Sequence, residues 1–153
     1  MEMQKIRTVT FCGHSELTNP DAVRVWLMET VESLISQGAV TFYLGGYGAF
    51  DRMAASVLQE KKRQHPHIES VLVLPYLDRE MDASGYDTTV YPPLESIPRR
   101  FAISKRNEWM VDASDAVVAC VTHDWGGAAK TLAYAKRKKK QIILYPERTW
   151  CDV

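Results

Sequence analysis

Three short segments of this 153-residue chain combine glycine with polar side chains just before a predicted helix. The first contains Gly13 and His14, the second Gly45, Gly46, Gly48 and Asp51, and the third His123, Asp124, Gly126 and Gly127. Glycine lets a backbone approach a phosphate closely, and the N–H groups and dipole of a helix N-terminus favour an anion. Together the segments predict a phosphate cradle, although any one of them alone is also typical of a tight turn.

Two carboxylates of these segments are candidates for chemistry. Asp51 stands at a predicted helix start, where it either caps free N–H groups or accepts hydrogen bonds from ribose hydroxyls. Cleavage of a glycosidic bond needs an acid or a nucleophile near the anomeric carbon. Asp51 and Asp124 are the loop carboxylates available for that role. Asp115 precedes a predicted strand and is expected at the opposite end of the sheet, as a structural cap.

Two histidines and two aromatic residues complete the candidate site. His14 and His123 follow strands that are adjacent in the usual Rossmann order, so their rings are expected to face one pocket and to contact phosphate or act as a general acid. No third ligand has metal-type spacing, and no metal is predicted. Trp125 and Tyr47 are suited either to stack on a base or to seal a dimer contact.

The elements that position these residues alternate regularly along the chain. Strand-like runs at 7–12, 40–44, 69–74, 116–121 and 141–145 are separated by helical patterns. This alternation predicts a Rossmann-like α/β fold, a three-layer sandwich with a mostly parallel sheet of about five strands. We expect a single domain over 1–153 with its core at about 7–145. Ligands of such sheets bind at the carboxyl ends of the strands, where all three segments lie.

The helical patterns have clear ends and apolar faces. Asn19 is a good N-cap, Pro20 suits the first helical position, and Gly38 ends the first helix. The second helix is predicted from an apolar stripe at helical spacing, formed by Phe50, Met53, Ala54, Val57 and Leu58. The last helix is expected over about 127–138 and ends in the basic run 136–140, which is expected to be a solvated face.

The stretch 75–98 breaks this rhythm. It is rich in Pro, Tyr and Asp and has only a hint of strand at 88–91. A connection of this length is usually functional or mobile.

Charge and cysteine content restrict the partners. Lys plus Arg total 19 and Asp plus Glu total 19, so the global field does not attract nucleic acid or an anionic membrane. Neither a signal peptide nor an apolar run of about 20 residues is evident. The odd cysteine count suits a reducing cytoplasm, with Cys12 and Cys120 as small buried hydrophobic residues.

The motifs around these segments resemble the SLOG superfamily, a Rossmann-like group that includes the LOG phosphoribohydrolases and the DNA-processing protein DprA. The resemblance is strongest to its YpsA-like branch and covers about 7–145. It rests on FCGH, GGYGAFDRMAA, KRNEWMVDASDAVVACV and WGGAAKTLAYAKRKKKQII, in that order. It implies a nucleotide-type ligand, phosphoribosyl or ADP-ribose-like, held by the two glycine loops with Arg106, Asn107 and Thr131. It also implies a homodimer. No cofactor is predicted. From its residue type alone, Arg106 is either a phosphate-binding fork or a surface ion pair.

One departure from the LOG enzymes changes the expected activity. Their second motif has the form PGGxGTxxE, and its glutamate serves cleavage of the N-glycosidic bond. Here the stretch 125–133 reads WGGAAKTLA, with no acid at that place. The first hypothesis is therefore a binding protein that senses or sequesters a nucleotide-derived ligand. The alternatives are an N-glycoside hydrolase of nucleoside monophosphates, a protein-interaction scaffold and, more remotely, a single-stranded DNA-binding protein.

Overall fold

The protein forms an α/β sandwich around one parallel sheet, shown in a computed structural model that describes residues 5–78 and 80–146. Six strands lie in the order β4-β3-β2-β1-β5-β6, and every neighbouring pair is parallel. They are β1 (Thr8–Gly13), β2 (Thr41–Leu44), β3 (Glu69–Val73), β4 (Thr88–Val90), β5 (Ala116–Cys120) and β6 (Gln141–Leu144).

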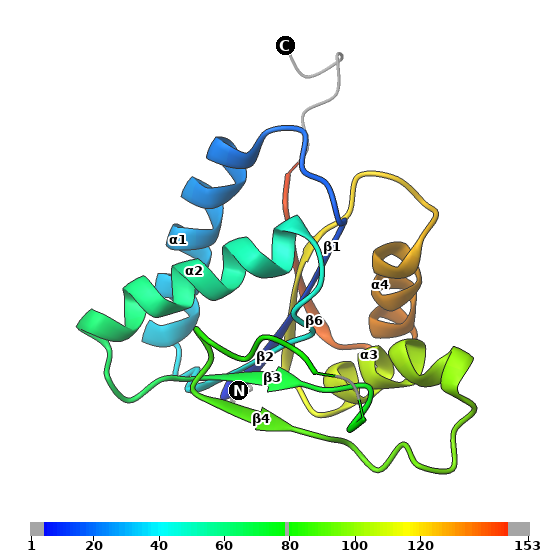
Figure 1. The fold of residues 1–153 in the computed structure, drawn as a ribbon. Coiled ribbons are helices and arrows are strands. Elements are labelled where there is room, and N and C mark those ends of the chain that lie inside the picture. The colour runs from blue at the N-terminus through cyan, green and yellow to red at the C-terminus, as the bar shows by residue number, and fades with distance from the viewer. Residues whose placement is uncertain (1–4, 79, 147–153) are drawn as a thin grey trace.

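Helices cover both faces of this sheet. The pair α1 (Pro20–Ser36) and α2 (Ala49–Gln64) packs together on one face, and α3 (Ala102–Asp112) and α4 (Gly127–Arg137) pack together on the other (Figure 1). A short 3-10 helix, η1 (Arg99–Phe101), precedes α3. The predicted fold class is confirmed. The sheet has six strands because the hint of strand at 88–91 forms β4, which pairs with β3.

The helix ends follow the predicted signals. The Asn19 side chain accepts a hydrogen bond from the Ala22 N–H at 3.4 Å, and Pro20 occupies the first turn of α1. Gly38, two residues past the end of α1, has φ +112°, a value that favours glycine. The expected stripe of α2 is largely buried, with Phe50, Val57 and other apolar residues in the main core cluster.

The sheet interior is apolar, and its two cysteines lie within it. Cys12 and Cys120 are both buried, as expected from their place in strand-like runs. Burial raises the pKa of the Cys12 thiol from 9.0 to about 12, so the thiol stays protonated and inert at neutral pH. In the described ranges, none of the helices has the length and apolar character that crossing a bilayer requires.

The long connection 75–98 packs on the body of the protein in its described parts. Tyr86 lies against the main core cluster, and Leu94 is buried. The Gln59 side chain donates a hydrogen bond to the Gly85 carbonyl at 2.9 Å, which ties the connection to α2. The part of this segment around Gly85 and Tyr86 therefore lies on the α2 side of the sheet.

The order of the strands creates a switch point between β1 and β5. The chain leaves β1 toward α1 on one face and leaves β5 toward α4 on the other, and both loops emerge at the same edge of the sheet (Figure 1). At such a point the two connections diverge and leave a crevice, the usual position of ligands in open parallel sheets.

Candidate functional site

The loop between β2 and α2 is filled by a side chain of the protein itself. The Asp51 side chain accepts a hydrogen bond from the Gly45 N–H at 3.2 Å, and backbone groups of Gly46 and Tyr47 also bond to it. Asp51 is only 8% exposed. Burial raises the pKa of this carboxyl from 3.8 to about 6, although the charge of Arg106 and the backbone hydrogen bonds act in the opposite direction. Its side chain therefore caps the loop from inside.

Arg106 braces the same loop from α3. Its Nη1 donates to the Gly45 carbonyl at 3.1 Å and to the Val73 carbonyl at 2.8 Å, and its Nε donates to Asn107 Oδ1 at 2.9 Å. The residue is 4% exposed, so the interpretation as a surface ion pair is wrong. The side chain joins the ends of β2 and β3 through their carbonyl groups.

Close packing explains the glycines of this loop. A Cβ atom at Gly48, where φ is +93°, would lie 2.8 Å from the Ser15 Cα, and one at Gly46 would lie 2.6 Å from Leu72 Cδ1. The Ala49 N–H at the start of α2 donates to the Ser15 carbonyl at 2.9 Å. Gly13 likewise leaves room for the Phe50 ring. The β2–α2 loop is thus closed by neighbouring parts of the chain.

The loop between β5 and α4 is open by comparison. Gly126 precedes α4 with φ +91° and ψ 176°, and its position gives no side-chain cap to the helix. A Cβ atom at Gly127 would meet no atom within 4 Å. Asp124 is exposed, whereas the Thr131 hydroxyl is largely buried and donates to the Gly127 carbonyl at 2.9 Å inside the helix. The start of α4 is therefore accessible from solvent.

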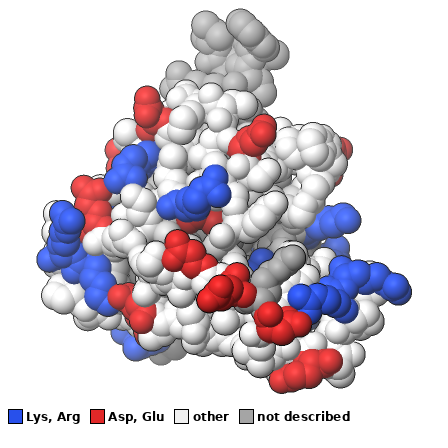
Figure 2. Space-filling view, in the orientation of Figure 1, with Lys and Arg blue, Asp and Glu red and all other residues white. Residues whose placement is uncertain are grey.

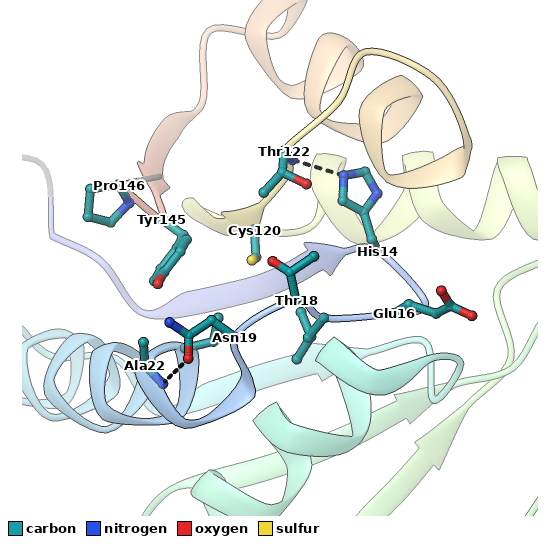
Figure 3. Close-up of a pocket in the computed structure, with 11 residues that line it drawn as sticks. His14, Glu16, Thr18, Asn19, Ala22, Cys120, Thr122, Tyr145 and Pro146 are labelled. Atoms are coloured by element: carbon teal, nitrogen blue, oxygen red, sulfur yellow. Dashed lines mark hydrogen bonds between the residues drawn. The ribbon is translucent and has the colours of Figure 1, made fainter. Parts of the chain in front are cut away.

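Three aromatic rings form a continuous stack beside this open loop. The His14 and His123 rings are 3.6 Å apart between centroids and 15° from parallel, and the His123 and Trp125 rings are 3.8 Å apart and 17° from parallel. The Thr122 N–H donates to His14 Nε2 at 2.9 Å, across the ends of β1 and β5 (Figure 3). The two histidines lie side by side at the ends of adjacent strands, and of the two, His14 lines the adjoining cavity.

A cavity of about 420 Å³ adjoins the stack at the switch point. This volume lies within the range of small-molecule sites, roughly 300–1,000 Å³. Figure 3 shows its walls, which come from the β1–α1 loop, the start of α1 and the ends of β5 and β6. The lining residues are His14, Glu16, Leu17, Thr18, Asn19, Ala22, Val23, Cys120, Thr122, Tyr145 and Pro146.

Most of this lining was missed by sequence reasoning. Thr18 and Tyr145 belong to no recognisable motif, Thr122 was noted only as the first residue of the third glycine-rich loop, and Asn19 was interpreted only as a helix cap. The available signal was positional. All of them lie at or beyond the carboxyl ends of β1, β5 and β6, the edge where ligands bind.

Several candidate residues lie elsewhere or serve the backbone. Asp115 Oδ2 accepts hydrogen bonds from the Arg7 and Thr8 N–H groups at 2.9 and 3.1 Å, the structural role predicted for it. Of the basic run, Lys138 pairs loosely with Asp112 at 3.9 Å on the surface. Among the residues that the structure describes, no three His, Cys, Asp or Glu side chains gather as a metal site.

Fold and site together define a Rossmann-like protein with a SLOG-like fold. No protein-family model matches the sequence. The chain is similar to the uncharacterised SPbeta prophage-derived protein YoqJ of Bacillus subtilis, with 25% identity over 134 residues, 72% of this chain and 78% of YoqJ. It is also similar to UPF0398 protein BH1768 of Halalkalibacterium halodurans, with 24% identity over 132 residues, 78% of this chain and 70% of that protein.

Solved structures share the fold. DNA processing protein A from Helicobacter pylori, described as binding single-stranded DNA, has a TM-score of 0.67 and 17% identity, over 94% of this chain and 67% of the other. The structure of TM1055 has a TM-score of 0.62 and 18% identity, over 90% of this chain and 72% of the other. The molybdenum cofactor carrier protein of Chlamydomonas reinhardtii has a TM-score of 0.59 and 18% identity, over 91% of this chain and 76% of the other.

Proposed function

We propose that this protein binds a nucleotide or nucleotide-derived small molecule, phosphoribosyl or ADP-ribose-like, between the ends of β1 and β5, and senses or sequesters it without turnover. The observation that carries the proposal is the open start of α4 at the switch point, where the His123 ring lies between Gly126 and His14, a residue of the cavity wall. In this position the first N–H groups of α4 can donate to a phosphate, and the helix dipole favours the negative charge.

The charge distribution supports a local anion site. The chain has no net charge, and Figure 2 shows positive and negative side chains interspersed over the face in view. A phosphate would therefore be held by directed N–H groups and not by a general positive field. A long polyanion gains little from such a surface, which favours a small ligand over nucleic acid.

The relatives support binding as the common property. One structural neighbour is described as binding single-stranded DNA and another as a carrier of a cofactor. The paired glycine motifs resemble those of the YpsA-like branch, to which we assign the chain as part of this proposal. A binding role also agrees with WGGAAKTLA, which has no acid at the place of the LOG glutamate.

The hydrolase alternative loses one of its two acids. Asp51 is buried, and its side chain is bonded to the backbone of its own loop. Asp124 remains exposed in the open loop and does not line the cavity, so the structure does not bring together the two loop carboxylates that glycoside cleavage would use. We therefore expect no release of free base or ribose phosphate when the protein is incubated with nucleoside monophosphates.

A thermal-shift screen with paired variants at one glycine tests the proposal. AMP, the other nucleoside monophosphates, ADP-ribose and NAD are added to the wild-type protein, and a ligand that binds only the native state raises Tm. At a ligand concentration of 100 times Kd, binding stabilises the native state by about 2.7 kcal/mol. Gly127→Asp should abolish this shift, because a carboxylate at the start of α4 repels phosphate while it favours the helix itself.

Gly127→Ala is the matched control. It adds a side chain in open space without charge and should retain the shift. The absence of a shift with every nucleotide would refute the proposal. A full shift in Gly127→Asp would place the phosphate away from α4.

A further inference from the structure

The outermost ring of the stack has a free face. Trp125 is 69% exposed, although one side of its indole lies against the His123 ring. A large apolar ring left in water is unfavourable in proportion to its exposed area. The free face of Trp125 is therefore available for another planar group at the edge where the proposed ligand lies.

The stack holds this indole in a defined orientation. The His14 ring is anchored because its Nε2 accepts the Thr122 N–H. His123 Nδ1 is buried and has no hydrogen-bond partner within 5–78 and 80–146, so the His123 ring is positioned by stacking against its two neighbours. A surface fixed before binding loses little conformational entropy when a ligand arrives.

We propose that Trp125 is the stacking platform for the base of a purine nucleotide whose phosphate lies at the start of α4; this inference rests on the proposed function. Trp125 and Gly127 are two residues apart, so their Cα atoms lie within about 8 Å of each other. One mononucleotide can therefore contact both. A bicyclic purine overlaps the bicyclic indole more fully than a pyrimidine does, so purines should bind more tightly.

Tyr47 provides the matched comparison. It is the most exposed large aromatic residue of the described chain, at 79%, but it lies on the closed β2–α2 loop. Within the described residues no aromatic ring packs against it in the way that His123 packs against Trp125. Exposure alone therefore does not distinguish the two residues, whereas a preorganised stack does.

Calorimetric titration of the full chain tests the platform with four probes: AMP, CMP, ribose 5-phosphate and a ten-residue oligo(dA). Trp125→Ala should weaken AMP binding by about 10-fold or more, because base stacking on an aromatic side chain typically contributes this much. Ribose 5-phosphate has no base, and its affinity should change by less than about twofold. Tyr47→Ala should leave AMP binding unchanged, and wild-type protein should bind AMP more tightly than CMP.

The outcomes separate this inference from the proposed function. If AMP binds to the wild-type protein and Trp125→Ala leaves Kd unchanged, the platform is wrong and the proposed function stands. Equal losses of affinity in Trp125→Ala and Tyr47→Ala would also overturn it. If neither AMP nor ribose 5-phosphate binds, both proposals fail. If only oligo(dA) binds, the occupant is single-stranded nucleic acid and the free nucleotide is excluded. An unchanged Tm of each variant without ligand shows that the fold is intact.

Discussion

The two glycine-rich loops have similar helix starts and opposite surroundings. Gly48 and Gly126 precede α2 and α4 with almost the same backbone angles, φ and ψ of 93° and 169° in one and 91° and 176° in the other. The first loop is packed against Ser15 and braced by Arg106, whereas the second faces solvent. A glycine before a helix can therefore mean close packing inside the protein or access from outside.

One position inside each helix accounts for much of this difference. Asp51 is the third residue of α2, and its side chain is bonded to backbone groups of the preceding loop. Ala129 is the third residue of α4 and has no polar group to offer. The first loop thus contains its own anion, and the second leaves its N–H groups for an external one.

The largest expected effect is the loss of the brace in the closed loop. Arg106→Ala removes a buried cation, takes away the charge that opposes Asp51 and removes the hydrogen bonds to the Gly45 and Val73 carbonyls. Removal of one partner from a buried charge network costs about 3–5 kcal/mol. Urea unfolding at pH 7 should show a loss of stability of this size.

Two further variants define the cause. Arg100→Ala removes an exposed arginine just before the same helix and should change stability by less than about 0.5 kcal/mol. Arg106→Lys should not restore the wild-type value, because an ammonium group cannot reproduce the planar fork. A loss below about 1 kcal/mol for Arg106→Ala would contradict the brace.

The next effect is a pH dependence confined to the closed loop. The pKa of Asp51 rises from 3.8 to about 6 on folding, mainly through burial. Folding therefore takes up a proton between these values, and the stability that Asp51 contributes is complete below about pH 4 and is lost as the pH rises to and through about 6. At about 1.4 kcal/mol for each pKa unit, the loss is on the order of 2–3 kcal/mol.

Asp51→Asn isolates this contribution. Other titrating groups remain in both proteins, so the difference in unfolding free energy between wild type and variant reports Asp51. Between pH 4 and 7 the wild-type protein should lose stability relative to the variant. Parallel stability curves over this range would show that the carboxyl does not change its pKa on folding.

Contacts that are local in the chain could be predicted from the sequence, whereas most long-range contacts could not. The strands, helices and caps follow from short-range patterns, because burial and backbone geometry act locally at residues such as Asn19 and Gly38. The proximity of His14 and His123 was foreseen from the positions of two adjacent strands, but the stacking of their rings was not. The hydrogen-bond partners of Arg106 could not be predicted, because Gly45 and Val73 are 61 and 33 residues away in the chain and contact it only in the folded protein.

The smallest effects distinguish two neighbouring glycines of the open loop. Gly126 has φ +91° and ψ 176°, a region almost exclusive to glycine, so Gly126→Ala should cost about 1–3 kcal/mol. Gly127 is the first residue of α4 with open space around it, and Gly127→Ala should stabilise the protein by up to about 1 kcal/mol, since it restricts the unfolded chain. Thermal unfolding of both variants without ligand measures the pair. Equal losses of stability in the two variants would mean that Gly127 is packed like the glycines of the first loop, and they would contradict the interpretation that the start of α4 is open.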